Sequence, residues 1–178
     1  GGDRTVQFWT VQGYDITLDI RLSNRGVGDR PYAIEYLWSG GTLNDQYNAN
    51  HEALTITPPE EASRAAIVAT ISGHGYSSDA EYCGEFCNHE NHFTVNGLST
   101  YTKDHPEAST AHGCADAVHI GTVPNQFGTW VYGRGGWCPG LQVDQWVQDI
   151  TADLTFGAEN TLEYHATIDG VEHYDTST

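Results

Sequence analysis

The sequence predicts an all-β fold in which two antiparallel sheets pack as a sandwich. Segments rich in β-branched and aromatic residues recur along the 178 residues, and glycine or proline separates them. One of these segments, residues 15–22, alternates strictly between polar and apolar residues, as a half-buried strand does. Short strands joined by such turns are typical of a two-sheet sandwich, so we expect this architecture.

The predicted strands follow one another along the chain. In order, they are residues 5–12, 15–22, 32–38, 53–57, 65–72, 92–96, 143–155 and 160–168. Breaks are predicted where glycine, proline or asparagine fall between them, at residues 26–31, 40–41, 58–59, 96–97 and 139–140. The only helical signal is a turn near residues 59–65.

The length of the chain suits one domain, and neither a linker nor an internal repeat interrupts it. We therefore expect a single domain over residues 1–178, with residues 1–12 as an extra strand. No run is long and apolar enough to span a bilayer, and the first residues lack a basic and apolar signal region. Because the chain begins with Gly1 and has no methionine, we expect a mature form or an excised piece.

The charge of the chain is strongly negative. Lysine and arginine total 7 and aspartate and glutamate total 24, which gives a formal net charge of −17. Such a surface repels nucleic-acid phosphates and anionic membranes, so neither is an expected partner. A solvated surface on an extracellular or salt-adapted protein explains the charge, and a specific cation-binding role is the alternative.

Four cysteines, an even number, fit two disulfides formed in an oxidising compartment. We therefore expect an exported protein, located outside the cell or at its surface. The alternative is a zinc site made by Cys83 and Cys87 with His89 and His92, but no second C-x-x-C pair supports it.

The segment C-G-E-F-C places Glu85 between Cys83 and Cys87. A disulfide between these two cysteines would close a very tight loop and hold the carboxylate on a rigid turn. The small Gly84 would let that turn approach a ligand. This turn is therefore a candidate functional platform.

Several short motifs occur in a fixed order and together identify a family. They are I-S-G-H-G at residues 71–75, C-G-E-F-C at 83–87 followed by His92 and an apolar strand, G-C at 113–114, and G-T-W at 128–130 ahead of R-G-G-W-C-P-G at 134–140. This series resembles the C-terminal jelly-roll domain of the peptide-N-glycosidase F family, bacterial amidases that remove N-glycans from asparagine. The chain follows the pattern from about residue 11 to about residue 167.

The resemblance implies a jelly roll of about eight strands. It also implies disulfides between Cys83 and Cys87 and between Cys114 and Cys138. Glu85 corresponds to a glutamate of the family's active site, and Arg134 to the arginine of a family motif. These two residues are the candidate catalytic residues. The structural alternative is that Glu85 caps its turn and pairs with Arg134.

Four aromatic or imidazole side chains near these motifs are candidate ligand contacts. His74 and Phe86 stand where the resembled family has tryptophan, which changes the expected lining of the site. Trp130 and Trp137 have rings that can stack on sugars, although core packing explains such aromatics equally well.

The resemblance covers only part of an amidase. In the resembled family a nucleophilic aspartate and one further acid come from a separate N-terminal jelly roll, which this sequence lacks. Because a lone carboxylate also needs an activated nucleophile within reach, we expect a binding or assembly module, not a self-sufficient amidase, with no cofactor. A glycan or glycopeptide is the expected ligand. The second reading is an enzyme half whose nucleophile comes from a partner domain.

The nine histidines suggest a copper or zinc protein as another alternative. The family's jelly-roll pair is similar in architecture to peptide-hydroxylating copper monooxygenases, whose ligands are histidines on strands. The narrowest ligand set is His74, His89 and His92, with His119 and His165 as further candidates. On a strand, however, His89 and His92 point to opposite faces, so they can share a metal only if their segment is a loop. The methionine ligand of those oxygenases has no counterpart here.

A further hypothesis concerns self-association. In the resembled domain another strand closes the jelly roll after a segment like residues 164–177, whereas this sequence stops at Thr178. Residues 5–12 form an additional strand-like segment, which would fill such a vacancy in a neighbouring chain by donor-strand complementation and form a polymer. The same segment folding back within its own chain, or a cloning or proteolytic boundary, is the alternative.

Overall fold

The computed structural model describes residues 5, 7, 31, 33–75, 84–124, 126–168 and 170–172. The chain divides into two compact units, Gly1–Tyr32 and Ala33–Thr178, and the described strands all belong to the second. The strands predicted at residues 5–12 and 15–22 lie outside the described residues, apart from Thr5 and Gln7. The expectation of a single domain over residues 1–178 stays a prediction.

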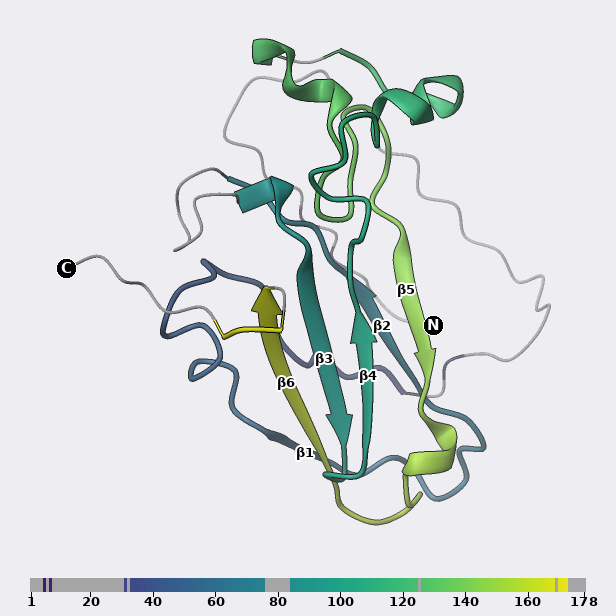
Figure 1. The fold of residues 1–178 in the computed structure, drawn as a ribbon. Helices are drawn as coiled ribbons and strands as arrows, with labels where there is room; N and C mark the ends of the chain where they lie inside the picture. The colour runs from purple at the N-terminus through teal and green to yellow at the C-terminus, as the bar shows by residue number, and fades with distance from the viewer. Residues whose placement is uncertain are drawn as a thin grey trace, which may run out of the picture. The chain divides into compact units, whose positions relative to one another are not determined.

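The described residues of the second unit form two antiparallel sheets (Figure 1). The larger sheet has the strand order β1 (Leu54–Ile56), β6 (Asn160–Ile168), β3 (His89–Val95) and β4 (Ser99–Lys103), and the smaller sheet pairs β2 (Ala66–Thr70) with β5 (Gln145–Asp149). Short 3-10 helices lie in the connections: η1 (Gly84–Phe86), η2 (Ala115–Ile120), η3 (Gln126–Val131) and η4 (Thr151–Asp153). This arrangement confirms the predicted all-β sandwich.

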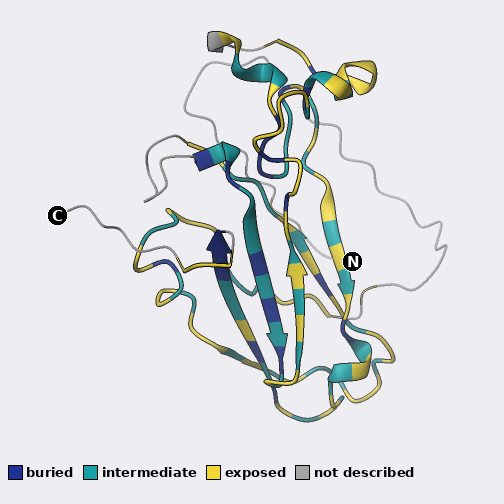
Figure 2. Cartoon of the chain, in the orientation of Figure 1, coloured by how far each residue is buried: buried dark blue, intermediate teal, exposed yellow. Residues whose placement is uncertain are grey.

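The core lies between the two sheets, where alternate residues of β3 and β6 point inward (Figure 2). The ring of Phe93 on β3 stacks against Trp146 on β5 with centroids 5.3 Å apart, so it joins the larger sheet to the smaller one. The buried cluster around this contact consists of Ile67, Phe93, Val95, Ile150 and Leu162. Removal of this apolar surface from water is the main force that holds the sheets together.

A tight turn at Asn96 and Gly97 joins β3 to β4. Both residues have positive φ, 52° and 64°, and Leu98 N–H donates to the Val95 carbonyl at 3.0 Å. Asparagine followed by glycine is the pair that tolerates such a hairpin turn best. The break predicted at residues 96–97 is therefore a hairpin. The sequence S-T-Y-T-K of β4 was not predicted as a strand.

Two predicted strands need correction. Residues 33–38 form no strand; instead Leu37 and Trp38 pack against the core from an irregular segment, with the Trp38 indole N–H donating to the Glu52 carbonyl at 3.0 Å. The segment 143–155 is a strand only over Gln145–Asp149. The Asp149 carboxylate accepts from Thr151 N–H at 3.0 Å and ends the strand in a local turn.

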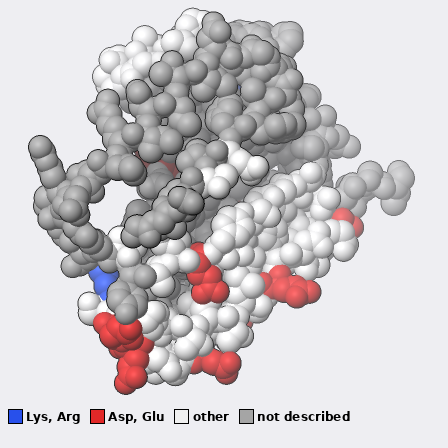
Figure 3. Space-filling model, turned by 180° about the vertical axis from the view of Figure 1, so that it is seen from behind, with Lys and Arg blue, Asp and Glu red and all other residues white. Residues whose placement is uncertain are grey.

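On the face seen from behind, the residues that the structure describes show several acidic groups and fewer basic ones (Figure 3). Among the residues that the structure describes, none belongs to a helix of the length and apolarity that crossing a membrane requires.

Candidate functional site

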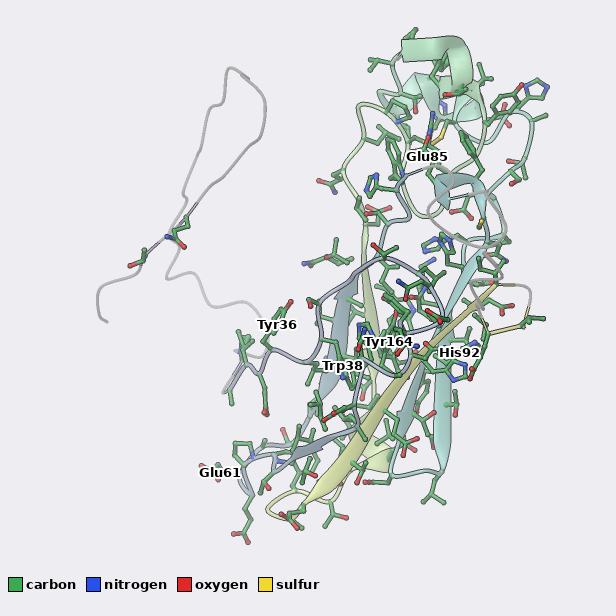
Figure 4. All side chains as sticks on the ribbon, turned by 90° about the vertical axis from the view of Figure 1, so that its left-hand side faces the viewer. Tyr36, Trp38, Glu61, Glu85, His92 and Tyr164 are labelled. Carbon is green, nitrogen blue, oxygen red and sulfur yellow. A yellow bond between two sulfur atoms is a disulfide. The ribbon has the colours of Figure 1, made fainter. Side chains whose placement is uncertain are left out.

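Backbone hydrogen bonds bring three distant motifs together at one end of the sheets. Gly73 N–H donates to the Gly135 carbonyl at 2.7 Å, Gly135 N–H to the Glu85 carbonyl at 2.7 Å, and Glu85 N–H to the Gly75 carbonyl at 3.0 Å. Figure 4 shows Glu85 beyond the ends of the strands, well away from His92 and Tyr164. The motifs that carry the family resemblance therefore form one site.

Two glycines make this close approach possible. A Cβ atom on Gly136, whose φ is +84°, would lie 2.5 Å from the Ile71 carbonyl oxygen. A Cβ atom on Gly73 would lie 2.7 Å from Cε1 and 2.8 Å from Nδ1 of His89. Neither position accepts a larger residue unless its surroundings move.

An ion pair between Glu85 and Arg134 is the centre of the site. Arg134 is buried, with 1% of its surface exposed, and its Nη1 group donates to Glu85 Oε1. Its Nη2 group donates to the carbonyl and the hydroxyl of Thr129 at 3.1 and 3.2 Å. The Glu85 side chain remains 21% exposed. Pairing is what allows a guanidinium to be buried here, because an unpaired charge would be strongly destabilising.

Aromatic and imidazole rings surround this ion pair. The Arg134 Cζ atom lies 4.9 Å from the centroid of Phe86 and 4.7 Å from that of Trp137. His74 packs on Trp137 at 4.7 Å, and Tyr132 meets Phe86 edge-on at 6.3 Å. We call these four rings, His74, Trp137, Phe86 and Tyr132, the ring stack.

The ring stack contains three of the four predicted ligand contacts. Trp137 is fixed by donation from its indole N–H to the Gly73 carbonyl at 2.6 Å, and His74 Nε2 lies 2.9 Å from the Ser72 hydroxyl. Trp130 lies half-buried on η3, outside the stack. Tyr132 was not among the predicted contacts, although it stands two residues before Arg134. The ligand-binding and catalytic roles of these residues stay predictions.

A disulfide between Cys114 and Cys138 confirms one of the two predicted pairs. It ties the start of η2 to the segment that carries Arg134 and Trp137, and Cys114 is fully buried. Cys87 is also disulfide-bonded. Its predicted partner, Cys83, lies outside the described residues.

A buried histidine, which we did not predict, lies beneath the Arg134 segment. His105 is 2% exposed, and its Cε1 atom would be 2.5 Å from a Cβ on Gly136. Its backbone N–H donates to the Asn88 side chain at 2.6 Å. Burial, and next the charge of Lys103, lowers the pKa of His105 to about 4, so the ring is neutral near neutral pH.

The predicted metal ligands do not come together in one place. His89 lies next to Gly73 in the site, whereas His92 projects from the opposite face of β3 and packs edge-on against His165, with centroids 5.6 Å apart. The two ring nitrogens of His92 lie 2.9 Å from the hydroxyls of Thr102 and Thr167.

His119 is placed on η2, and within the described ranges no group of three or more histidine, cysteine or acidic side chains is arranged to hold a metal. The residues present do not fit a shared metal site made by His74, His89 and His92. Copper or zinc binding stays a prediction.

A concave surface of about 630 Å³ lies over the larger sheet, and Glu85 is not among its lining residues. Several of its polar side chains already have hydrogen-bond partners: the hydroxyls of Thr94 and Thr100 are 2.8 Å apart, and Thr167 donates to Glu90 Oε2 at 2.6 Å. The bond from Thr167 lowers the pKa of Glu90, and burial lowers the pKa of His92. The lining residues include Asn48, His51, His92, Thr94, Thr100, Glu163, Tyr164, His165 and Thr167.

Comparison with known proteins places these features in a family. The family model described as "Peptide-N-glycosidase F, C terminal" matches residues 42–175, so the match begins later than the expected residue 11 and continues past 167. The peptide-N(4)-(N-acetyl-beta-D-glucosaminyl)asparagine amidase F of Elizabethkingia miricola is 29% identical over 111 residues, which are 60% of this chain and 29% of that protein.

Two solved structures have the same fold in part of their length. They are a peptide-N(4)-(N-acetyl-beta-D-glucosaminyl) asparagine amidase and recombinant peptide:N-glycanase F, each 24% identical with a TM-score of 0.50. Each match covers 67% of this chain and 38% of the other. The chain thus spans well under half the length of the relatives that it matches.

Proposed function

Because the chain belongs to the peptide-N-glycosidase F C-terminal family, we propose that it is a binding module for N-glycosylated asparagine. In this proposal Glu85 makes the central contact, and the ring stack around Arg134 lines the binding surface. The module acts outside the cell, where its disulfides persist. The ligand class comes from the name of the related amidase, whose substrate carries an N-acetylglucosaminyl group on asparagine.

The hydrogen bonding of the Glu85 carboxylate is the observation that supports this proposal. Arg134 holds Oε1, and the side chain makes no other hydrogen bond within the part of the chain that the structure describes. An ion-paired carboxylate accepts hydrogen bonds, and its second oxygen is left for a ligand. Amide N–H groups and sugar hydroxyls are donors of the required kind. The adjacent rings provide apolar surface for the C–H faces of a sugar.

Hydrolysis of an amide needs more than this carboxylate. A nucleophile or an activated water must lie within hydrogen-bond reach of a base, and Arg134 is the only described side chain bonded to Glu85. The chain also spans only 29% of the related amidase. We therefore propose a module that binds without hydrolysing; the second reading, one half of an amidase completed by another domain, uses the same residues.

The test is binding of a peptide that carries N-acetylglucosaminyl-asparagine, measured by calorimetry or by ligand-observed NMR. Glu85→Gln should weaken binding by about tenfold, because a charged hydrogen bond becomes a neutral one. Glu163→Gln is the matched control, because Glu163 is an exposed glutamate on β6. Equal affinity in wild type and Glu85→Gln would refute the proposal. Glycan release by the chain alone, abolished in Glu85→Gln, would instead identify a complete amidase.

Self-association by strand exchange is a separate proposal. In the described part of the chain, β2 and β5 each pair on one side only, so the smaller sheet offers edges for a further strand. The candidate donor, residues 5–12, lies outside the described residues apart from Thr5 and Gln7. Light scattering of the full chain and of a variant lacking residues 1–12 tests it, since polymers should form in the first sample only.

A further inference from the structure

We propose that Tyr132 is a second ligand contact, and that its hydroxyl and the Glu85 carboxylate bind the two ends of one amide group. This inference rests on the proposed function and extends it from one contact to two. Tyr132 belongs to the ring stack through its contact with Phe86, and 44% of its surface is exposed.

The position of Tyr132 is fixed by the same groups that fix Arg134. The Thr129 carbonyl accepts from Arg134 Nη2 at 3.1 Å and from Tyr132 N–H at 3.3 Å. The ring of Tyr132 meets Phe86 at an interplanar angle of 84°, and Phe86 directly follows Glu85 in η1. Tyr132 and the ion pair therefore share one backbone anchor and one aromatic neighbour.

The residue after Tyr132 makes this arrangement rigid. Gly133 N–H donates to the Thr110 carbonyl at 2.9 Å, and the Gly133 carbonyl accepts from Ser109 N–H at 3.1 Å. A Cβ atom on Gly133 would lie 1.7 Å from the Glu107 carbonyl oxygen, so the backbone is packed too closely to shift. A contact held on such a rigid support binds with a small loss of entropy.

The chemistry of the two groups is complementary to an amide. The Tyr132 hydroxyl makes no hydrogen bond within the described ranges, so it is available to donate to a carbonyl oxygen. The ionised Glu85 carboxylate accepts from an N–H group. An amide offers both partners. The proposed ligand holds the acetamido group of the sugar, the amide that links the sugar to asparagine, and the backbone amides of the peptide.

The experiment uses Tyr132→Phe in the full chain, which removes only the hydroxyl. The ligands are an N-acetylglucosaminyl-asparagine peptide, free N-acetylglucosamine and free glucosamine, each titrated and followed by ligand-observed NMR. Tyr132→Phe should weaken peptide binding by about fivefold, the effect of one neutral hydrogen bond. Tyr36→Phe, at an exposed tyrosine far from Glu85, should leave every affinity unchanged (Figure 4).

The pattern across the ligands identifies the amide that is bound. Weaker binding of both N-acetylglucosamine and the peptide indicates the acetamido group, and weaker binding of the peptide alone indicates the linking amide or a backbone amide of the peptide. If glucosamine loses as much affinity as the others, the hydroxyl does not recognise an amide and the inference is wrong. If Glu85→Gln weakens peptide binding and Tyr132→Phe does not, the inference fails while the proposed function stands. If the wild-type chain binds none of the three ligands, both fail.

Discussion

The sheets and the region that carries Glu85 are held together by different forces. The sheets bury apolar side chains such as Phe93, Val95 and Leu162. The site region, residues 71–75, 84–88 and 105–141, buries Arg134, His105 and Cys114 among tightly packed glycines. Backbone hydrogen bonds, a disulfide and an ion pair stabilise it in place of an apolar core. The site region should therefore be able to unfold locally while the sheets stay folded. The sheets should not unfold while the site region stays folded.

The largest loss of stability should come from a substitution in the core between the sheets. Phe93→Ala removes a ring that contacts Trp38, Tyr164 and Trp146 and leaves a cavity in the core. We expect the free energy of unfolding to fall by about 3–5 kcal/mol, measured by denaturant titration. Val68→Ala, on the outer face of β2 and 57% exposed, should cost less than about 1 kcal/mol. Similar losses in the two variants would contradict the assignment of the core.

Loss of the disulfide should have the next largest effect on stability. It also tests directly whether the site region and the sheets are stabilised separately. Replacing both Cys114 and Cys138 by serine releases a loop with a sequence separation of 24, which should cost about 3 kcal/mol. Hydrogen exchange should accelerate at residues 129–137 while the amides of β3 stay protected. Faster exchange in β3 to the same extent would show that the two regions unfold as one.

The pH dependence of stability should report on His105. Burial, followed by the Lys103 charge, lowers its pKa to about 4, with a partial opposing effect from Glu107. Between pH 6.5 and pH 4 the unfolded chain therefore binds a proton that the folded chain does not, so stability falls as the pH falls. From about pH 7 to about pH 5 we expect a loss of about 2 kcal/mol.

His105→Phe should remove most of this slope, whatever its effect on stability at neutral pH. The lowered pKa of His92 should leave a smaller slope of the same sign. His119→Gln, at an exposed histidine on η2, is the control and should retain the wild-type slope. Denaturant titrations at several pH values measure the wild type and both variants, and an unchanged slope in His105→Phe would assign the effect to other groups.

The smallest change in stability should come from a substitution in an ion pair at the surface. Arg64 and Asp149 form an ion pair at 3.0 Å, but their side chains are 59% and 50% exposed. Because solvent screens such a pair, Arg64→Ala should change the free energy of unfolding by less than about 0.5 kcal/mol. A thermal or denaturant titration with and without salt would detect a larger contribution if the pair belonged to a network.

Strands could be predicted from the sequence where the pattern of apolar residues within the segment itself favours a strand. Residues 160–168 match β6 from end to end because Leu162, Ala166 and Ile168 recur at inward positions. Strand β4 was missed because Tyr101 is its only large apolar residue, and pairing with β3 is what makes it a strand. Residues 33–38 have strand-like composition but no ladder partner in the described part of the chain.

The candidate site was predictable only through the order of its motifs. No local pattern relates Gly73, Glu85 and Gly135, which meet through tertiary hydrogen bonds. His105 stands in the polar run K-D-H-P-E, which reads as an exposed loop, and it is buried because the Arg134 segment packs over it. Tyr132 was likewise recognisable only once its contact with Phe86 was seen.

The close contact between Gly73 and His89 has a consequence for how this family can diverge. Position 73 lacks room for even a methyl group while His89 keeps its ring there. A lineage that acquires alanine at position 73 would first need a smaller residue at position 89. The intermediate chain, changed at only one of the two positions, would be less stable. The two positions should therefore be inherited as a pair and change together, with a measurable coupling energy between them.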